Sequence, residues 1–151
     1  MLMSAKTSEY IQFQLVNITI EQFALITDNY NPKIQSGGIY VAIKFGVDVQ
    51  KKHVINHIKI QLDQEKKVFL ILETSNHYQI NPDNWFEIKK TEKQFIIPKD
   101  LATHLAMIST GTIRGILFEK TKNTPEITPV VFPLINIQSL VTKNVELNLN
   151  D

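Results

Sequence analysis

Residue types that often carry chemistry are few in this chain, and their spacing does not assemble a reactive site. His53 and His57 are four residues apart, a spacing that places two metal ligands on one face of a helix. Here both fall in an alternating, strand-like segment, where residues four apart lie roughly 13 Å from each other. His77 and His104 are isolated in the sequence. Because a zinc site needs ligands that converge, the sequence predicts no metal site.

Motifs for hydrolysis and for phosphate binding are also missing. No serine sits in a tight glycine elbow, and no pair of carboxylates has a spacing suited to acid–base work. Gly37 and Gly38 indicate a turn rather than a phosphate cradle, because no helix with a lysine follows them. The chain has no cysteine, which excludes thiol catalysis, thiolate metal sites and disulfides. We therefore expect no enzyme activity and no cofactor.

Three aromatic side chains are better candidates for a functional surface. Tyr30 is the only aromatic residue of a long polar loop at residues 26–38, and Trp85 and Phe86 lie in an irregular stretch at residues 81–95. Large apolar rings are not needed to form a loop. They either fold back onto the core or line an apolar groove for a ligand or an extended peptide, and the sequence leaves both interpretations open.

The longest element that must position these residues is a helix predicted over residues 98–121. Pro98 suits the first helical position, Asp100 complements the helix dipole, and apolar residues recur every three or four positions. Several small or polar residues in its second half are poor helix formers, which suggests close approach by a second copy of the helix. The residues expected at that interface are Ser109, Gly111, Thr112, Gly115 and, as an ion-pair partner, Arg114. The alternatives are a helix that only covers a sheet of its own chain and an Arg114 side chain that extends to solvent.

Strand-like alternation occurs before this helix. Residues 10–25 alternate with a change of parity near Asn17, which predicts a bulge or bend in one long strand. Residues 39–50 alternate cleanly, so one face of this strand should be buried and the other wet. Two further strands, at residues 53–63 and 68–80, follow after short turns and complete a three-stranded meander.

Composition indicates one ordinary soluble globular domain. The 151 residues are 43% hydrophobic and 21% charged, and residues 1–9 are expected to be disordered. A net charge of +1 offers no basic surplus for phosphates, so nucleic acid is not an expected partner. No signal-peptide pattern and no long apolar run is present, so we expect a cytoplasmic protein without membrane insertion. Residues 122–137 hold three prolines and should be extended, before a short helix or strand at residues 138–147.

The order of these elements resembles the SecB family of protein-export chaperones. The detailed cues are QFQLVNITIEQF near the start, IRGIL in the predicted helix and FPLINIQSL near the end. At these places the family has a strand, a helical arginine followed by apolar residues, and a segment of the form F-P-x-x-N-x-x-x-L. The resemblance extends from about Tyr10 to Leu140.

The resemblance implies a fold, an assembly and a function. The fold is α+β: a four-stranded antiparallel sheet with a long helix and a short C-terminal helix packed on one face, in a single domain of residues 1–151. Such proteins assemble as dimers of dimers with the long helix at the subunit interface, so a homodimer or homotetramer is expected here. They bind unfolded, non-native polypeptide in grooves beside the loop after the first strand. By analogy Tyr30, Trp85 and Phe86 would contact the client, with sheet-edge pairing and apolar pockets supplying affinity and preference.

Charge distinguishes this chain from typical members of the family. SecB proteins are strongly acidic and dock the export ATPase through an acidic sheet surface. Here the wet face of the sheet is expected to carry Lys44, Lys59 and Asp48, and residues 143–151 are only mildly acidic. A solitary SecB-like chaperone, such as those paired with toxin–antitoxin systems, therefore fits better than a protein that hands cargo to the export motor.

Two alternative functions remain open. The chain is either a module dedicated to one client protein on the same fold, or an α+β protein with a small-ligand pocket. A closed cavity that brings together His57, His77 or Trp85 would favour the pocket protein.

Overall fold

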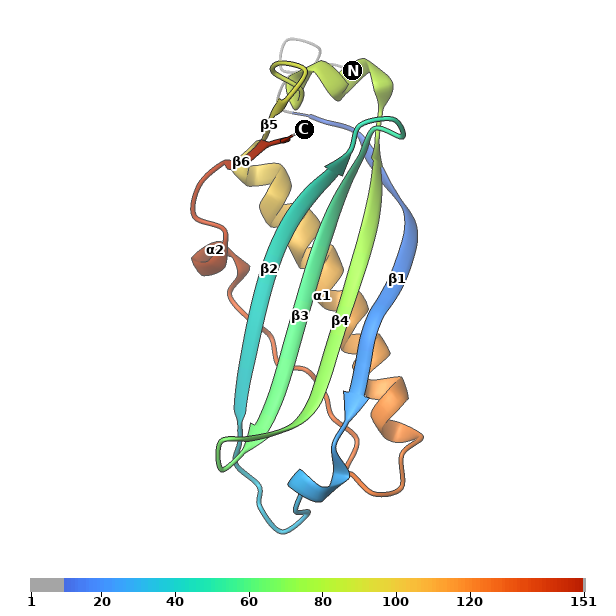
Figure 1. The fold of residues 1–151 in the computed structure, drawn as a ribbon, viewed down its shortest axis with the longest axis vertical. Helices are drawn as coiled ribbons and strands as arrows, with labels where there is room; N and C mark the ends of the chain where they lie inside the picture. The colour runs from blue at the N-terminus through green and yellow to red at the C-terminus, as the bar shows by residue number, and fades with distance from the viewer. Residues whose placement is uncertain (1–9, 151) are drawn as a thin grey trace.

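A computed structural model of the chain describes residues 10–150, and the expectation for residues 1–9 lies outside that range. Four long strands form one antiparallel sheet in the order β1-β4-β3-β2 (Figure 1). Their bounds are β1 (Phe13–Leu25), β2 (Gly38–Asp48), β3 (His53–Gln64) and β4 (Lys67–Ile80). The predicted meander is β2-β3-β4, and β1 joins it beside β4.

Alternating side chains give the central strands β3 and β4 one buried face and one more open face, whereas no residue of the edge strands β1 and β2 is buried. The buried face predicted for residues 39–50 is therefore only partly covered. Every second residue of β3 is buried, beginning with Val54. In β1 the parity change predicted near Asn17 is confirmed as a register shift between Leu15 and Asn17. A second shift, between Ile20 and Gln22, was not predicted; two such irregularities in one edge strand bend it around the sheet.

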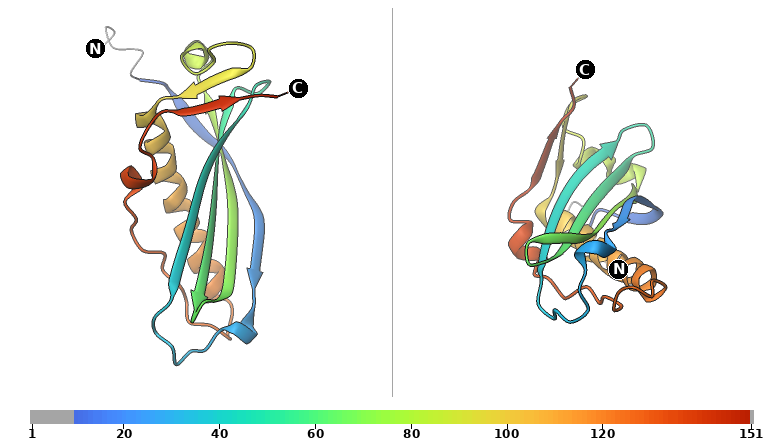
Figure 2. Two further views of the ribbon diagram at one scale, coloured as in Figure 1. Left: turned by 60° about the vertical axis from the view of Figure 1, so that its left-hand side comes forward. Right: turned by 60° about the horizontal axis from the view of Figure 1, so that its bottom comes forward.

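Helix α1 (Lys99–Lys122) lies across one face of the sheet and leaves the other face uncovered (Figures 1 and 2). Its start is held by Asn144, whose side-chain oxygen accepts a hydrogen bond from the backbone N–H of Lys99 at 2.8 Å. By length and composition α1 would suffice to cross a membrane, but 44% of its most apolar 18-residue window is buried inside the protein. The predicted α+β fold is confirmed, with helix bounds one residue from those expected.

The 3-10 helix η3 (Pro82–Glu87) and strands β5 (Gln94–Ile97) and β6 (Val145–Asn148) lie at one end of the molecule (Figure 1). Helix α2 (Ile137–Leu140) lies nearer the middle of its length, and the 3-10 helix η2 (Thr27–Asn29) follows β1. The pair β5–β6 forms a separate two-stranded antiparallel sheet. Residues 138–147 therefore contribute to both structures that the sequence left open, the end of a short helix and then a strand.

Two apolar cores join α1 to the sheet, and buried polar side chains separate them. The upper core includes Tyr78 and Leu105, and the lower core includes Leu72 and Leu117. Between them along β3 and β4 lie the fully buried side chains of Asn56, Thr74 and Asn76. Within the described residues, the Asn56 Oδ1, the Thr74 hydroxyl and both polar atoms of the Asn76 side chain have no hydrogen-bond partner. Burial of such groups opposes stability, so this polar layer costs stability that the two apolar cores must offset.

Candidate functional site along the edge of β2

The outer edge of β2 has no strand partner within residues 10–150, because β2 pairs only with β3. The chain that faces this edge is the return segment (residues 123–144), which runs from the end of α1 through α2 to the start of β6. Two hollows open between the edge and its surroundings, and together they form what we call the edge groove. The lower hollow has a volume of about 590 Å³ and the upper hollow about 830 Å³.

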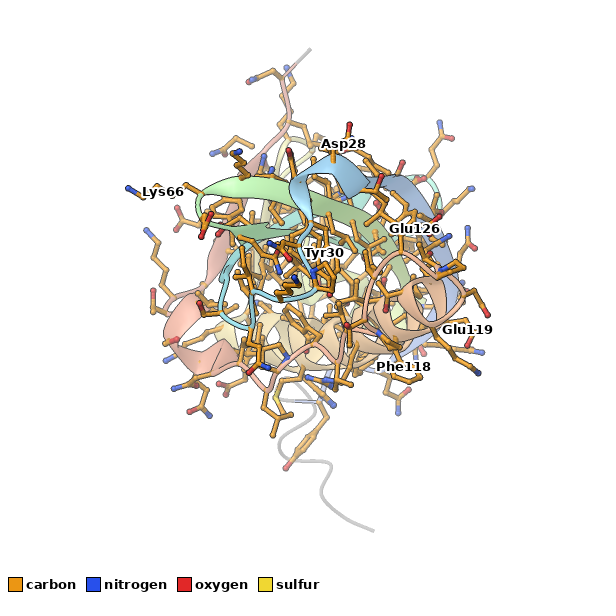
Figure 3. The ribbon with its side chains drawn as sticks, turned by 90° about the horizontal axis from the view of Figure 1, so that it is seen from below. Asp28, Tyr30, Lys66, Phe118, Glu119 and Glu126 are labelled. Atoms are coloured by element: carbon orange, nitrogen blue, oxygen red, sulfur yellow. The ribbon has the colours of Figure 1, made fainter. Side chains whose placement is uncertain are left out.

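The lower hollow lies at the start of β2. It is lined by the loop between β1 and β2, by Leu62 and Phe69 of the neighbouring strands, and by residues 128–131 of the return segment. The Tyr30 ring packs on the Phe69 ring at 5.0 Å between centroids, and the Tyr30 hydroxyl accepts a hydrogen bond from the Thr128 N–H at 3.1 Å. Tyr30 therefore joins two walls of the hollow, and Figure 3 shows it near the centre of this end of the molecule.

A buried glutamine holds the loop in place. The Gln64 side chain is 7% exposed and accepts a hydrogen bond from the Asn31 N–H at 2.8 Å. Its amide N–H groups donate to the carbonyl oxygens of Asn31 and Ile34 at 3.2 and 3.1 Å. A buried amide must be paired to be tolerated, and here its partners are all backbone groups of one loop. The loop is thus a preformed wall.

Gly37 and Gly38 allow this wall to approach β3 closely. A Cβ atom at Gly37 would collide with the carbonyl oxygen of Asp63, and one at Gly38 would lie 2.7 Å from a carboxylate oxygen of the same residue. The Asp63 carboxylate also accepts a hydrogen bond from the Gly38 N–H at 3.1 Å. Gly37, predicted as part of a turn, is therefore needed for close packing of the loop, whereas a methyl group at Gly38 would displace only the Asp63 side chain.

The upper hollow lies farther along the same edge. Its strand side is Ile43, Lys44 and Phe45, and its other side is residues 140–147. The return segment that leads to it is fixed from α1. Arg114 donates from Nε to the Phe132 carbonyl at 2.9 Å and from Nη2 to the Pro133 carbonyl at 3.4 Å. Arg114 therefore holds a wall of the groove in its own chain.

The structure does not bring the three predicted aromatic residues together. Trp85 is 6% exposed and packs on Phe95 at 5.8 Å between ring centroids, so it folds back onto the upper core. Phe86 is 69% exposed, but it lies in η3, at the opposite end of the molecule from Tyr30 (Figure 1). Of the three, only Tyr30 lines the edge groove.

Sequence reasoning missed most of the groove. Phe69 and Phe45 looked like ordinary core residues of apolar strands, and no local pattern marks the strand edge that they border. Gln64 did carry a signal, because it continues the buried parity of β3 with a polar side chain. A polar residue at a buried position needs specific partners. The strand predicted from the sequence ends at residue 63 and so leaves Gln64 in the turn, whereas the structure places it at the buried end of β3.

The residues predicted for a subunit interface divide into two groups. Ser109 is fully buried and shares a 2.7 Å hydrogen bond with the Tyr78 hydroxyl, and burial raises the pKa of that tyrosine. Thr112 is half-buried, and its hydroxyl donates to the Ile108 carbonyl at 3.1 Å. Gly111 and Gly115 are on the surface, and an added Cβ at either would meet no atom within 4 Å. Only the two glycines offer an open surface.

The uncovered face of the sheet carries three histidines. The rings of His53 and His77 lie 6.2 Å apart between centroids, and His57 Nδ1 lies 2.6 Å from the Ser75 hydroxyl oxygen. Burial lowers the pKa of both His53 and His57. Within residues 10–150, no group of three or more histidine or carboxylate side chains is placed to hold a metal ion.

The comparisons with known proteins concern the fold. The sequence matches no protein-family model and no curated protein. A SecB-like chaperone of Mycobacterium tuberculosis, solved in complex with a ChAD peptide from the HigA1 antitoxin, superposes with a TM-score of 0.55. It is 12% identical, over 87% of this chain and 94% of that chain. A protein of unknown function from Streptococcus agalactiae superposes at 0.42, with 14% identity over 82% of this chain and 98% of that one, which is too low to carry an argument. The first likeness shows that this chain has a SecB-like fold.

Proposed function

We propose that this protein is a SecB-like chaperone that binds unfolded or extended apolar polypeptide segments along the edge of β2. The observation that carries the proposal is an unpartnered strand edge bordered by two hollows. The fold supports it, since the structurally similar mycobacterial chaperone was solved with a peptide from another protein. In this role the protein has no enzyme activity, no cofactor and no nucleic-acid partner, and it acts in the cytoplasm.

Edge pairing explains how one site can accept many sequences. The free N–H and C=O groups of β2 would pair with the backbone of a guest strand, which every extended chain provides. The hollows would bind side chains from one face of the guest strand, and apolar side chains would bind more tightly because their burial is favourable. The strand edge then supplies affinity for any extended chain, and the hollows supply the preference for apolar side chains.

A module dedicated to one client is the second candidate. It is favoured by the fixed wall of the lower hollow, where Gln64 holds the loop at Asn31 and the loop's own Tyr30 joins it to Thr128 of the return segment. A preformed groove loses less entropy when it binds a matching partner. Saturable binding of a single protein, without suppression of general aggregation, would favour this candidate, including a partner in a toxin–antitoxin system.

Assembly into a homodimer or homotetramer is part of the proposal. Gly111 and Gly115 lie on the exposed side of α1 near two large apolar side chains, Met107 at 56% and Phe118 at 39% exposure. Figure 3 shows Phe118 on the side of α1 that faces away from the sheet. Small residues next to exposed apolar ones suit close packing of a second helix.

The proposed function is tested by aggregation of a chemically unfolded client at stoichiometric ratios of the protein, with molecular mass read by light scattering on the same sample. We expect suppression of aggregation. Replacing Tyr30 with alanine should weaken the suppression, because the lower hollow loses an aromatic ring and the hydrogen bond to Thr128. Phe86→Ala is the matched control, since Phe86 is an exposed aromatic residue far from the groove. Unchanged aggregation with wild-type protein would contradict the chaperone role.

A further inference from the structure

The edge groove has two hollows on one strand, and their separation along that strand is fixed. The lower hollow includes Ile39, and the upper hollow includes Ile43 and Phe45. These three residues share one parity of β2, the parity whose side chains face the helix-covered side of the sheet. Val41 lies between them with the same parity. It packs on the lower core and lines neither hollow.

A guest strand paired with β2 would follow the same geometry. Its side chains would alternate between the two faces, and residues four apart would lie roughly 13 Å from each other. The step from Ile39 to Ile43 is four residues and that from Ile39 to Phe45 is six. Side chains separated by an odd number of residues would point to opposite faces of the extended sheet, so only one of them could enter a hollow on the helix side.

We infer that the groove selects extended segments with two bulky apolar side chains separated by four or six residues, one for each hollow. This inference rests on the proposed function and narrows its substrate class. Each hollow falls in the range of roughly 300–1,000 Å³ that accommodates compact ligands, so leucine or phenylalanine side chains have room. A pair separated by two residues cannot reach both hollows, because the position two residues from Ile39 faces Val41, and the positions facing Ile43 and Phe45 belong to the same hollow.

The test uses synthetic peptides of equal composition in an extended, polar background. Each carries two leucines separated by three, four, five or six residues, and a further peptide carries one leucine. Binding is measured by fluorescence anisotropy. We expect separations of four and six to bind at least about tenfold more tightly than three and five, because only they bury the second leucine. The odd-separation peptides should bind like the single-leucine peptide.

A variant identifies the hollow that is used. Ile39 is 46% exposed at the mouth of the lower hollow, so Ile39→Lys is expected to fold and to place a charge there. It should reduce binding of the separation-four and separation-six peptides to the level of the single-leucine peptide. Equal affinity of all two-leucine peptides would overturn the spacing while leaving the proposed function intact. If no peptide binds while aggregation is still suppressed, clients are held elsewhere and the inference is wrong. Loss of both activities would end the proposed function as well.

Discussion

At the scale of single residues, Gln64 determines the shape of the lower hollow. We expect Gln64→Leu to lower the free energy of unfolding by about 1–3 kcal/mol, because it leaves backbone groups of Asn31 and Ile34 without their partner. Urea unfolding measures the change. Gln61→Leu on the same strand is the control: its side chain lies on the uncovered face, and its effect should stay within about 0.5 kcal/mol. Equal effects would mean that the loop is held by other contacts.

We expect two histidines on the uncovered face to make stability depend on pH. Burial lowers the pKa of His53 and His57 in the folded protein from the ordinary value of 6.5, although nearby Asp48 and Glu21, respectively, act in the opposite direction. The unfolded chain then takes up protons more readily than the folded one. The unfolding free energy therefore keeps its full value above pH 6.5, and it decreases as the pH falls through the lowered pKa values of the two histidines.

The measurement for this prediction is urea unfolding at several pH values from about 7.5 down to about 5. The unfolding free energy should decrease toward the acid end. The double variant His53→Gln with His57→Gln should show a smaller decrease over the same range. An identical pH profile for wild type and variant would show that these histidines do not cause the dependence.

At the scale of elements, the turn between β3 and β4 can be made more stable by substitution. Glu65 and Lys66 both adopt positive φ, 50° and 67°, in a two-residue hairpin turn between Gln64 and Lys67. Asparagine and glycine are the residues that such turns prefer. Glu65→Asn with Lys66→Gly should raise the unfolding free energy by about 0.5–1 kcal/mol, measured by thermal or urea unfolding. A decrease would indicate that the lysine or glutamate side chain makes a stabilising contact.

The elements that could be predicted are those whose pattern is local. The strand at residues 39–50 and the helix at residues 98–121 could be recognised because their apolar residues repeat within the segment itself, with a period of two or of three to four residues. The pair β5–β6 was not predicted, since each strand has four residues and its partner lies about fifty residues away. No periodicity develops in so short a segment.

The candidate site could be predicted only in part, for a related reason. Tyr30 was singled out because a large ring is unusual in a polar loop, and it does line a hollow. Trp85 had the same local signal, yet its ring packs on Phe95 of β5, a strand that the sequence did not reveal. Whether a loop aromatic is exposed or buried depends on what the rest of the chain places beside it, and that is a tertiary property.

At the scale of the whole molecule, the open surface at Gly111 and Gly115 gives a test of assembly. Alanine at each position meets no atom within 4 Å beyond the adjacent backbone of its own helix and should stabilise an isolated chain by up to about 1 kcal/mol per site, through helix propensity. If a second helix packs there, the same methyl groups hold the helices apart. We expect the double alanine variant to melt at a higher temperature when dilute and to show a lower mass by light scattering when concentrated. An unchanged mass would place any assembly on another surface.

The return segment lies opposite the free edge of β2. Its position limits which conformations of a client can bind there. A folded domain presents the edge of its own sheet together with the layers packed on that sheet, and the segment held by Arg114 and Asn144 stands where those layers would have to go. A single extended chain has no packed layers and can lie in the edge groove. In the proposed role the return segment therefore makes binding depend on the client's conformation. A client binds while it is unfolded and no longer binds once it has folded.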